Sequence, residues 1–489
     1  MSDDDKPAKA TTSHDIAVPP WLQEFIARDW DDAPPMPHPA RPDLAPHTAA
    51  RRARLSQHYP GIVVVIAAGA AKTRANDTDY PFRAFSAFTW LTGETCQDAV
   101  LVLTPIGDSH QATLYIPEYA PPGELGYYAS RQGALWIGNV PTPSETKAIL
   151  QINTRGRASL QADLALLRET PTRSVSGLDP ALDELLPQAI CGDLNRVLDE
   201  LRLVKDDWEI GRLDAACQAT ARGFADVVRE LPRLIEGKVA RGERWLEGTF
   251  WRRARLEGNE VGYTSIIGAG RDATVLHWWR NHSEVADGQL LLADVGIETD
   301  ELYTADITRT MPVNGSWSAE QLKVYQAVQQ AQAAGIDEVK AGADFLAAHR
   351  AAMWVLADHL HSWGILEVSA DVSCGDDPEA PGAGAHRRYT LHSTSHMLGI
   401  DVHDCAKARA ENYTKATLQA GHVLTVEPGL YFQTNDRTVP QELRGIGVRI
   451  EDDIVVTDGA PRNLSASLPR DPAEITEWMR EVQASEIEL

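Results

Sequence analysis

Three histidines and two aspartates lie close together in the stretch TLHSTSHMLGIDVHD, residues 390–404. Imidazole binds metals, transfers protons and donates hydrogen bonds near neutral pH, so this stretch is the first candidate for chemistry. On a helix, His392 and His396 would share one face, as in the His-Glu-x-x-His zinc peptidases. Ser393 stands where that motif has its glutamate base, and the surrounding STS is weak helix material. The stretch, with His403 included, therefore indicates another kind of site, or histidines that only pack in the core or on the surface.

Two aspartates lie in apolar runs that resemble the arms of a β-hairpin around the letters ETDEL. Facing positions in an antiparallel pair bring side chains within about 5 Å, so Asp294 and Asp306 can converge on one point. Two buried carboxylates that close repel each other unless a proton or a cation lies between them. The alternative is that one or both aspartates merely cap turns.

Two glutamates stand inside strand-like apolar runs, Glu427 in VLTVEPGLYF and Glu451 in IGVRIEDDIVVTDG. A glutamate is costly in such a strand unless it is paired. Arg449 precedes Glu451 by two residues, hence on the same strand face, where it could hold that carboxylate by a charge-assisted bond. This segment therefore also allows a structural arginine–glutamate pair with an acidic, solvent-facing edge.

Together these residues form a ligand set of four carboxylates and one imidazole, each within an apolar segment: Asp294, Asp306, His396, Glu427 and Glu451. Oxygen-dominated ligands with one nitrogen suit divalent ions of the manganese or cobalt type better than thiolate-seeking zinc. The sequence therefore predicts two such ions that share the carboxylates as bridges.

The elements that must position these residues follow from the apolar periodicity. Helical spacing predicts two helices over 193–231 and further helices at about 244–257, 318–342 and 345–364. Strand-like runs lie at 261–269, 288–298, 301–313, 422–432 and 446–457. Because these runs often come as close pairs, we expect a mainly antiparallel sheet with helices on its outer face, hence an α+β fold. The long Gly/Pro/Asp segment 369–388 is expected to overhang the site.

The first part of the chain has a different character. Short apolar runs between residues 61 and 116, among them GIVVVIAA, predict the strands of a small α/β domain. Prolines make residues 32–46 an extended arm, and the first twenty residues cannot support a core. We therefore predict an arm over 1–45, a first domain over 46–190, a catalytic domain over 191–475 and a tail over 476–489.

Composition excludes several classes of protein. The 489 residues carry 46 basic and 70 acidic side chains, a net charge of −24, which argues against nucleic acid as a partner. The start has no apolar signal segment, and the longest apolar stretch, 61–71, is about half a membrane span. Five scattered cysteines without a Cys-x-x-Cys pair are typical of reduced thiols. We expect a cytoplasmic protein that does not bind membranes.

The chain resembles the metal-dependent pita-bread (M24-type) peptidases, and within them the aminopeptidase P family. The family's ligand order Asp, Asp, His, Glu, Glu recurs here in matching contexts: ADVG for Asp294, ADITRT for Asp306, TSHMLG for His396, VEPG for Glu427 and VRIEDD for Glu451. RANDTDYPFRAFSAFTWLTG (74–93) resembles the family's amino-terminal domain, and RLVKDDWEI (202–210) the usual start of its catalytic domain.

This resemblance implies roles for further residues. His277 and His403 correspond to substrate-contacting histidines, and His392 to a proton-relay histidine outside the ligand set. Arg449 and Tyr431 fall on family positions near the metals, with Tyr431 placed among the substrate-binding residues. Glu427 is expected to act both as a ligand and as the group that accepts the proton of the attacking water.

The implied activity is hydrolysis of the bond between an amino-terminal residue and a following proline by a water that two metal ions activate, Mn²⁺ first, with Co²⁺ or Zn²⁺ as alternatives. The partners would be peptides with proline at the second position, and the assembly a homodimer or homotetramer. Two other readings are a prolidase, which cleaves Xaa-Pro dipeptides, and a non-catalytic peptide-binding protein of the same fold.

Two departures from the family pattern stand out. Most members have one residue fewer between the two aspartates, so we expect the turn ETDEL to absorb an extra residue as a bulge or a wider turn. Ser393 occupies a position where glycine is common, which would narrow the space near the scissile bond and tune rate or specificity.

Overall fold

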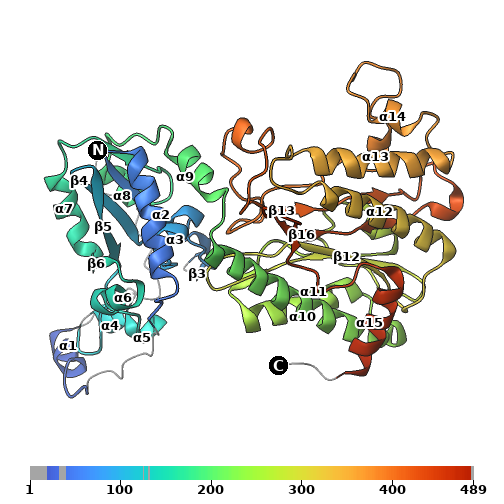
Figure 1. Ribbon diagram of the computed structural model, residues 1–489. Helices are drawn as coiled ribbons and strands as arrows, with labels where there is room; N and C mark the ends of the chain where they lie inside the picture. Colours follow the sequence, from blue (N-terminus) through green and yellow to red (C-terminus); the bar gives the residue numbers. More distant parts are fainter. Residues whose placement is uncertain (1–18, 32–39, 77, 125, 130–132, 486–489) are drawn as a thin grey trace, which may run out of the picture. The chain divides into compact units, whose positions relative to one another are not determined.

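The computed structural model describes residues 19–31, 40–76, 78–124, 126–129 and 133–485. The chain forms two compact units, Met1–Leu198 and Asp199–Leu489, each with its own sheets (Figure 1). The predicted domain limit at 190/191 stays a prediction, and the division between the units falls within helix α9 (Leu194–Arg202). Much of the predicted amino-terminal arm lies outside the described residues, and the part inside them includes a short helix, α1 (Pro20–Ile26).

The first unit is built around a five-stranded mixed sheet with the order β6-β5-β4-β1-β7. Its strands are β1 (Val63–Ala67), β4 (Val100–Ile106), β5 (Ser109–Ile116), β6 (Asn153–Gly156) and β7 (Thr172–Ser174), and β2 (Thr73–Ala75) and β3 (Thr78–Asp79) form a separate pair. Its longer helices are α2 (Ala45–His58), α3 (Ser86–Thr92), α6 (Pro143–Leu150), α7 (Leu160–Leu166) and α8 (Pro180–Leu185). Two short helices, α4 (Gly126–Ala129) and α5 (Ala134–Ile137), complete it.

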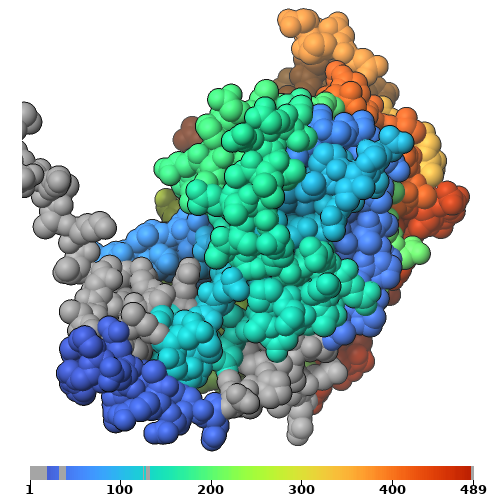
Figure 2. Space-filling view, turned by 90° about the vertical axis from the view of Figure 1, so that its left-hand side faces the viewer, coloured from blue at the N-terminus to red at the C-terminus, as the bar shows by residue number. Residues whose placement is uncertain are grey.

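Strand β1 has every residue buried, as its unbroken Val/Ile run predicts for a strand covered on both faces. It pairs antiparallel with β4 and parallel with β7. Its residues Val63 and Val65 belong to a buried cluster that includes Leu160 of α7 and Leu182 of α8. Figure 2 faces this unit, and the dark blue segment around α1 lies at its margin. The predicted small α/β domain is therefore confirmed.

The second unit contains the remaining elements. Its helices are α10 (Asp207–Gly237), α11 (Gly242–Glu257), α12 (Ala319–Asp337), α13 (Ala347–Ser362), α14 (Ala370–Ser373) and α15 (Pro472–Ala484). Its strands are β8 (Glu260–Val261), β9 (Ile266–Ala269), β10 (Leu290–Val295), β11 (Ile297–Glu298), β12 (Ile307–Pro312), β13 (Val423–Val426), β14 (Gly429–Tyr431), β15 (Gly447–Arg449), β16 (Asp452–Val455) and β17 (Arg462–Asn463). The tail predicted from residue 476 thus begins inside α15.

All strand pairs of the second unit among the described residues are antiparallel, in the orders β12-β10-β9, β13-β16-β17, β14-β15 and β11-β8. Helix α11 contacts β9, and α12 contacts both β13 and its neighbour α13. The expected α+β architecture, an antiparallel sheet covered by helices, is confirmed. None of the helices in the described part of the chain combines the length and apolar character that crossing a membrane requires.

Each predicted strand run around a candidate ligand is shorter or more broken than its apolar pattern suggests. The run 422–432 becomes β13 and β14, which are separated by Glu427 and Pro428, and the run 446–457 becomes β15 and β16, separated at Glu451. Proline cannot donate a ladder hydrogen bond, so Pro428 explains the first break. The breaks place these acids where the backbone bends.

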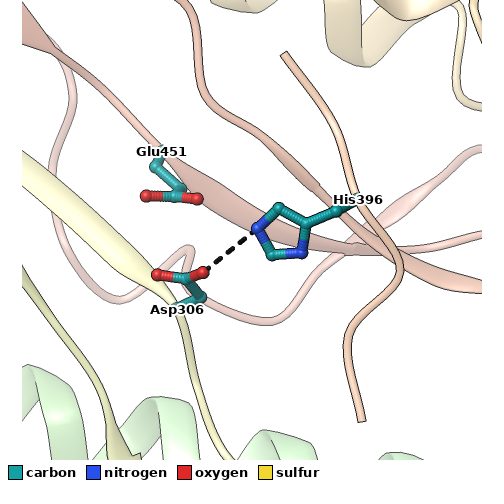
Figure 3. Close-up of side chains that lie close together, drawn as sticks. All are labelled: Asp306, His396 and Glu451. Atoms are coloured by element: carbon teal, nitrogen blue, oxygen red, sulfur yellow. Dashed lines mark ion pairs between the residues drawn. The ribbon is translucent and has the colours of Figure 1, made fainter. Parts of the chain in front are cut away.

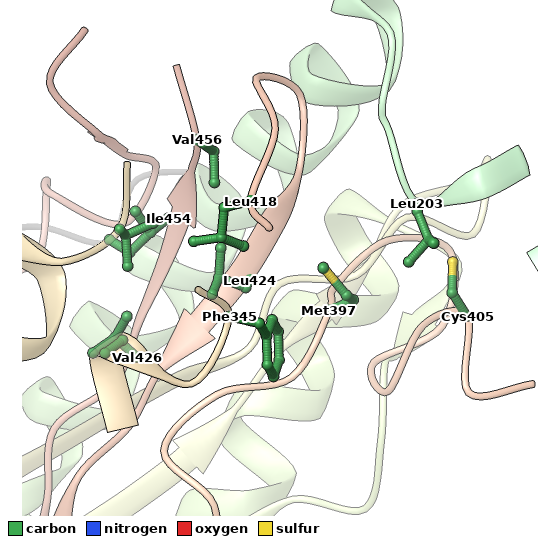
Figure 4. Close-up of a cluster of buried hydrophobic side chains, with 11 residues drawn as sticks. Leu203, Phe345, Met397, Cys405, Leu418, Leu424, Val426, Ile454 and Val456 are labelled. Atoms are coloured by element: carbon green, nitrogen blue, oxygen red, sulfur yellow. The ribbon is translucent and has the colours of Figure 1, made fainter. Parts of the chain in front are cut away.

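The histidine stretch is fixed to the core of the second unit. Met397 pairs with Leu424 of β13 in an isolated bridge, and both side chains are buried beside Phe345 and Ile454 (Figure 4). A fully buried cluster of this kind resists displacement, because interiors pack closely. The backbone on either side of His396 therefore has a fixed position.

The segment 369–388 does not overhang the site as predicted. Helix α14 and the short turn at Ala385–Arg388 both pack against α13, and no residue of the segment lines the cavity described below (Figure 1). His386 is buried and shares a hydrogen bond with the Ser373 hydroxyl at 2.8 Å. The glycines and prolines therefore shape a surface excursion instead of a lid.

Candidate active site

A cavity of about 1190 Å³ opens in the second unit, and every predicted site residue lines it except Tyr431. The Tyr431 hydroxyl contacts two of the lining residues, His392 and Arg449. The ten predicted site residues therefore fall in one region. Those in the cavity wall are His277, Asp294, Asp306, His392, His396, His403, Glu427, Arg449 and Glu451.

Three of them converge most closely. Asp306, His396 and Glu451 each offer one ligand atom, and these atoms all lie within 4.8 Å of one another. Figure 3 shows the three side chains pointing toward one another. The Nε2 atom of His396 lies 3.3 Å from Oδ2 of Asp306 and 3.7 Å from Oε1 of Glu427. Asp306, His396 and Glu451 lie far apart in the sequence, so only the tertiary fold brings them together.

The aspartates come from the predicted hairpin, but with a different register from direct opposition. Asp294 in β10 pairs with Thr308 of β12, so Asp306 is two residues away along the same strand path. Side chains two residues apart share one face of a strand, which keeps both carboxylates on the site side. The hairpin closes with Leu302 at φ 68°, and the Leu302 N–H donates to the Thr299 carbonyl. A residue in the left-handed region at this point is typical of a bulged hairpin turn.

Two residues that were not predicted from the sequence, Tyr263 and Thr308, hold Asp294 and Glu451 in place. The Tyr263 hydroxyl donates to Oδ1 of Asp294 at 2.7 Å, and the Thr308 hydroxyl donates to Oε2 of Glu451 at 2.6 Å. Tyr263 lies in the polar letters VGYTS, which carry no motif that could have identified it. Thr308 lies beside Asp306 in ADITRT, where the two-residue spacing on β12 was a usable signal.

Arg449 pairs with a different acid from the one that its place in the sequence suggests. Its Nη2 atom donates to Oδ2 of Asp294 at 2.5 Å, and its other nitrogens donate to Tyr431 and Thr308. The alternative of a structural pair between Arg449 and Glu451 is not what the structure shows, because β15 ends at Arg449 and the backbone turns before Glu451. The arginine thus orients an acid on a distant strand.

The acids of the cluster strain one another electrostatically. Burial and then repulsion from Asp306 and Glu427 raise the pKa of Glu451 well above its usual value. Burial raises the pKa of Glu427 to about 8, against the opposing effect of His396. Mutual repulsion of buried carboxylates is relieved by a proton or a cation between them. The donor set, oxygen-rich with one nitrogen, fits a divalent cation.

The imidazole of His396 is oriented for ligation. Its Nδ1 lies 3.2 Å from the Met397 carbonyl, which can only accept, so Nδ1 carries the proton and Nε2 faces the carboxylates. Burial lowers the pKa of His396, but Asp306 and Glu427 outweigh burial and raise it to about 9. A cation in the cluster would take the place of that proton.

His392 belongs to a neighbouring network. Its Nε2 lies 2.8 Å from the Tyr431 hydroxyl, which accepts from Arg449 at 3.0 Å, and its Nδ1 lies 3.4 Å from Oε2 of Glu427. Burial, and then the charge of Arg449, lower the pKa of His392 to about 4. The ring is therefore neutral at neutral pH and touches the acid Glu427 on one side.

His277 and His403 lie in the cavity wall without contacting the carboxylates. The ring of His403 stacks edge-on against His396 with centroids 4.4 Å apart. His277 is exposed to the cavity beside Trp279. Ser393, also in the wall, donates to the Ser395 carbonyl at 3.3 Å. His277 and His403 are therefore placed to face a molecule bound in the cavity.

Comparison with known proteins agrees with this geometry. Residues 211–458 match the model of metallopeptidase family M24, and residues 48–171 match the aminopeptidase P N-terminal domain. The chain is 47% identical to Xaa-Pro aminopeptidase 2 of Streptomyces coelicolor, over 89% of this chain and 91% of that protein. It is 31% identical to the Xaa-Pro aminopeptidase of Escherichia coli, over 88% and 96% of the two chains.

A solved structure of E. coli aminopeptidase P with the inhibitor Pro-Leu superposes with a TM-score of 0.78, at 28% identity, over 90% of this chain and 99% of that one. The similarity therefore spans both units and not the catalytic part alone. With its site geometry, the chain belongs to metallopeptidase family M24, in the branch that carries the aminopeptidase P N-terminal domain.

Proposed function

We propose that this protein is a metal-dependent Xaa-Pro aminopeptidase, which hydrolyses the bond between an amino-terminal residue and a following proline. The observation that carries the proposal is the convergence of Asp306, His396 and Glu451 within 4.8 Å in a large cavity. Its relatives at 47% and 48% identity are named Xaa-Pro aminopeptidases. A set of buried acids that repel one another is typical of a functional cation site. A protein that only binds peptides would not need such a site.

The five residues Asp294, Asp306, His396, Glu427 and Glu451 would hold two divalent cations. Bound divalent cations supply Lewis acidity, which acidifies water and polarises a carbonyl group. Arg449 and Tyr263 fix Asp294, and Thr308 fixes Glu451, so that the carboxylates are oriented before any ligand arrives. Such neighbours of ligands tune affinity and activity.

Glu427 is the group that we assign to proton transfer. It is buried, lies beside both His396 and His392, and its carboxylate accepts the proton of the attacking water. His392 is held by Tyr431, which accepts from Arg449, and its Nδ1 lies 3.4 Å from the Glu427 carboxylate. His277 and His403 donate hydrogen bonds to the substrate carbonyls, where negative charge develops during the attack.

The size of the cavity supports an aminopeptidase over a dipeptidase. Pockets for small ligands usually measure about 300–1,000 Å³, and this one measures about 1190 Å³. Room beyond two residues suits longer peptides with proline at the second position. Because a tertiary amide has no N–H, proline is recognised by the shape of its ring. A prolidase remains the second candidate.

Three finer points belong to the same proposal. Manganese is the expected metal, with cobalt or zinc as alternatives, because the donors are mostly oxygen. The cysteines are all free, which suits a reducing, cytoplasmic location. A homodimer or homotetramer is expected by likeness to the family.

The test compares hydrolysis of Ala-Pro with hydrolysis of Ala-Pro-Ala, with manganese and again after chelation. We expect alanine to be released from Ala-Pro-Ala with manganese only, and the chelated enzyme to recover when manganese is restored. Cleavage of Ala-Pro alone would make the protein a prolidase. No cleavage of either peptide with manganese, cobalt or zinc would leave a binding role as the leading account.

A further inference from the structure

The turn that follows the ligand His396 carries His403, and the two ends of this turn differ in how they are held. At its start, the Met397 N–H donates to the Tyr413 hydroxyl at 2.8 Å and the Leu398 N–H donates to the Val423 carbonyl at 2.9 Å. The second of these bonds, together with the bond from the Thr425 N–H to the His396 carbonyl at 3.0 Å, ties His396 to strand β13. At its far end, residues 400–404, no strand pairing is found among the described residues.

A buried acid, Asp404, fixes that far end through two ion pairs. Oδ1 of Asp404 accepts from Arg202 at 2.7 Å, and Oδ2 accepts from Lys205 at 2.8 Å. Asp404, Arg202 and Lys205 are respectively 1%, 3% and 4% exposed. Two cations on one buried carboxylate fix its position in two directions, because each bond is charge-assisted and short.

The surroundings leave this carboxylate little freedom. A side chain at Gly399 would meet Oδ2 of Asp404 at 2.3 Å, so the turn closes directly on the acid. Lys205 is fixed in turn, since its ammonium also donates to the Arg202 carbonyl and its N–H donates to the Gly421 carbonyl, both at 2.8 Å. The Asp404 N–H donates to the Met397 carbonyl at 2.9 Å.

We infer that Asp404, held by Arg202 and Lys205, is a positioning residue that sets the imidazole of His403 against His396 for contact with substrate. The inference rests on the role proposed for His403. Residue 404 directly follows His403, so a shift of the acid moves the ring, whereas His396 keeps its own ties to β13. Asp404 itself does not line the cavity, whereas His403 does.

The test substitutes Asp404→Asn in the full chain and measures kcat and KM on Ala-Pro-Ala, manganese affinity and Tm. Displacement of a positioned group by about 1 Å costs about 100-fold, and loss of a supporting partner about 10–100-fold. We therefore expect kcat/KM to fall about 10–100-fold, with manganese affinity unchanged. In a His403→Ala background the same substitution should have no further effect.

A matched control separates positioning from stability. Asp226, also buried, accepts from Arg253 at 2.8 Å and 3.2 Å away from the cavity. Asp226→Asn should lower Tm as Asp404→Asn does and leave kcat/KM at its wild-type value. Should Asp404→Asn fail to fold, Lys205→Met tests the same bond with Arg202 still in place.

Three results would overturn the inference: full activity in Asp404→Asn, losses that multiply in the His403→Ala background, or a parallel loss of manganese affinity. If the wild-type protein cleaves neither peptide, the proposed function fails instead. The inference is then judged by a crystal structure of Asp404→Asn, in which an unmoved His403 contradicts it.

Discussion

Asp306, the ring of His396 and the carboxylate of Glu451 offer ligand atoms that lie within 4.8 Å of one another. The position of Asp306 depends on the strand β12 that it precedes, and its backbone N–H donates to Asp453 at 3.0 Å. The backbone of Asp306 is therefore held independently of its carboxylate. We expect replacement of the side chain to remove a proposed cation ligand while this backbone contact stays in place.

We predict that Asp306→Ala lowers both manganese affinity and turnover by more than about 100-fold, since even supporting partners of ligands cost about 10–100-fold. Titration with manganese and assay on Ala-Pro-Ala measure the two effects. Asp300→Ala is the matched control, because Asp300 is an exposed aspartate in the turn of the same hairpin. Metal binding at the wild-type level in Asp306→Ala would exclude this residue as a ligand.

The residue types that form the cluster could be predicted from the sequence, whereas the contacts between them could not. Asp294, His396 and Glu451 each stood out as a polar group within an apolar run. The bond from Arg449 to Asp294 joins strands that are more than 150 residues apart in the sequence, and local spacing points instead to Glu451. Pairing over such a distance is fixed by strand register, which one sequence does not contain.

At the scale of elements, Glu427 and Glu451 lie where a predicted strand is interrupted. Apolar periodicity predicted each strand-bearing region, but it joined β13 to β14 and β15 to β16, because the apolar run continues across each bend. Pro428 was a readable signal for the first break. At Glu451 no residue type marks the second break, which follows from the bond between its N–H and the Thr308 carbonyl on another strand.

The hairpin turn that sets the spacing of the two aspartates includes Leu302 in the left-handed region, at φ 68°. For leucine this conformation costs about 1–2 kcal/mol, yet its side chain is buried, and truncation of a buried leucine costs about 2–5 kcal/mol. Burial wins, so a bulky residue is retained where glycine would suit the backbone.

We predict that Leu302→Gly lowers the free energy of unfolding by about 1–3 kcal/mol, the difference between the lost burial and the relieved strain. Leu302→Ala should be less stable than Leu302→Gly by about 1 kcal/mol, because alanine keeps the strain and loses the packing. Urea denaturation of the three proteins measures this order. Equal or greater stability of the alanine variant would show that the turn carries no strain.

At the scale of the whole molecule, the second unit buries many ionisable groups, and the sum of their proton equilibria sets how its stability depends on pH. Near the active site a cation changes these equilibria. His422 offers a cleaner case, because it lies at the start of β13, is buried, and accepts a hydrogen bond at Nδ1 from the Gln419 N–H at 3.4 Å.

Burial, and then the charge of Lys205, lower the pKa of His422 from 6.5 to about 4. The unfolded chain therefore binds a proton below pH 6.5 that the folded chain refuses. The stability that neutral His422 contributes is complete above pH 6.5 and is lost as pH falls from 6.5 toward 4. Each pH unit in this window costs about 1.4 kcal/mol, or on the order of 3 kcal/mol in all.

We predict that the wild type loses on the order of 3 kcal/mol more unfolding free energy than His422→Gln when the pH falls from 7 to 4. Glutamine keeps an acceptor for Gln419 and has no proton to gain, so the acids common to both proteins cancel in the difference. Urea denaturation with a chelator present measures it without competition from metal. A difference that stays constant with pH for His422→Gln would mean that the folded protein accommodates the charged ring, and that acid sensitivity arises elsewhere in this unit.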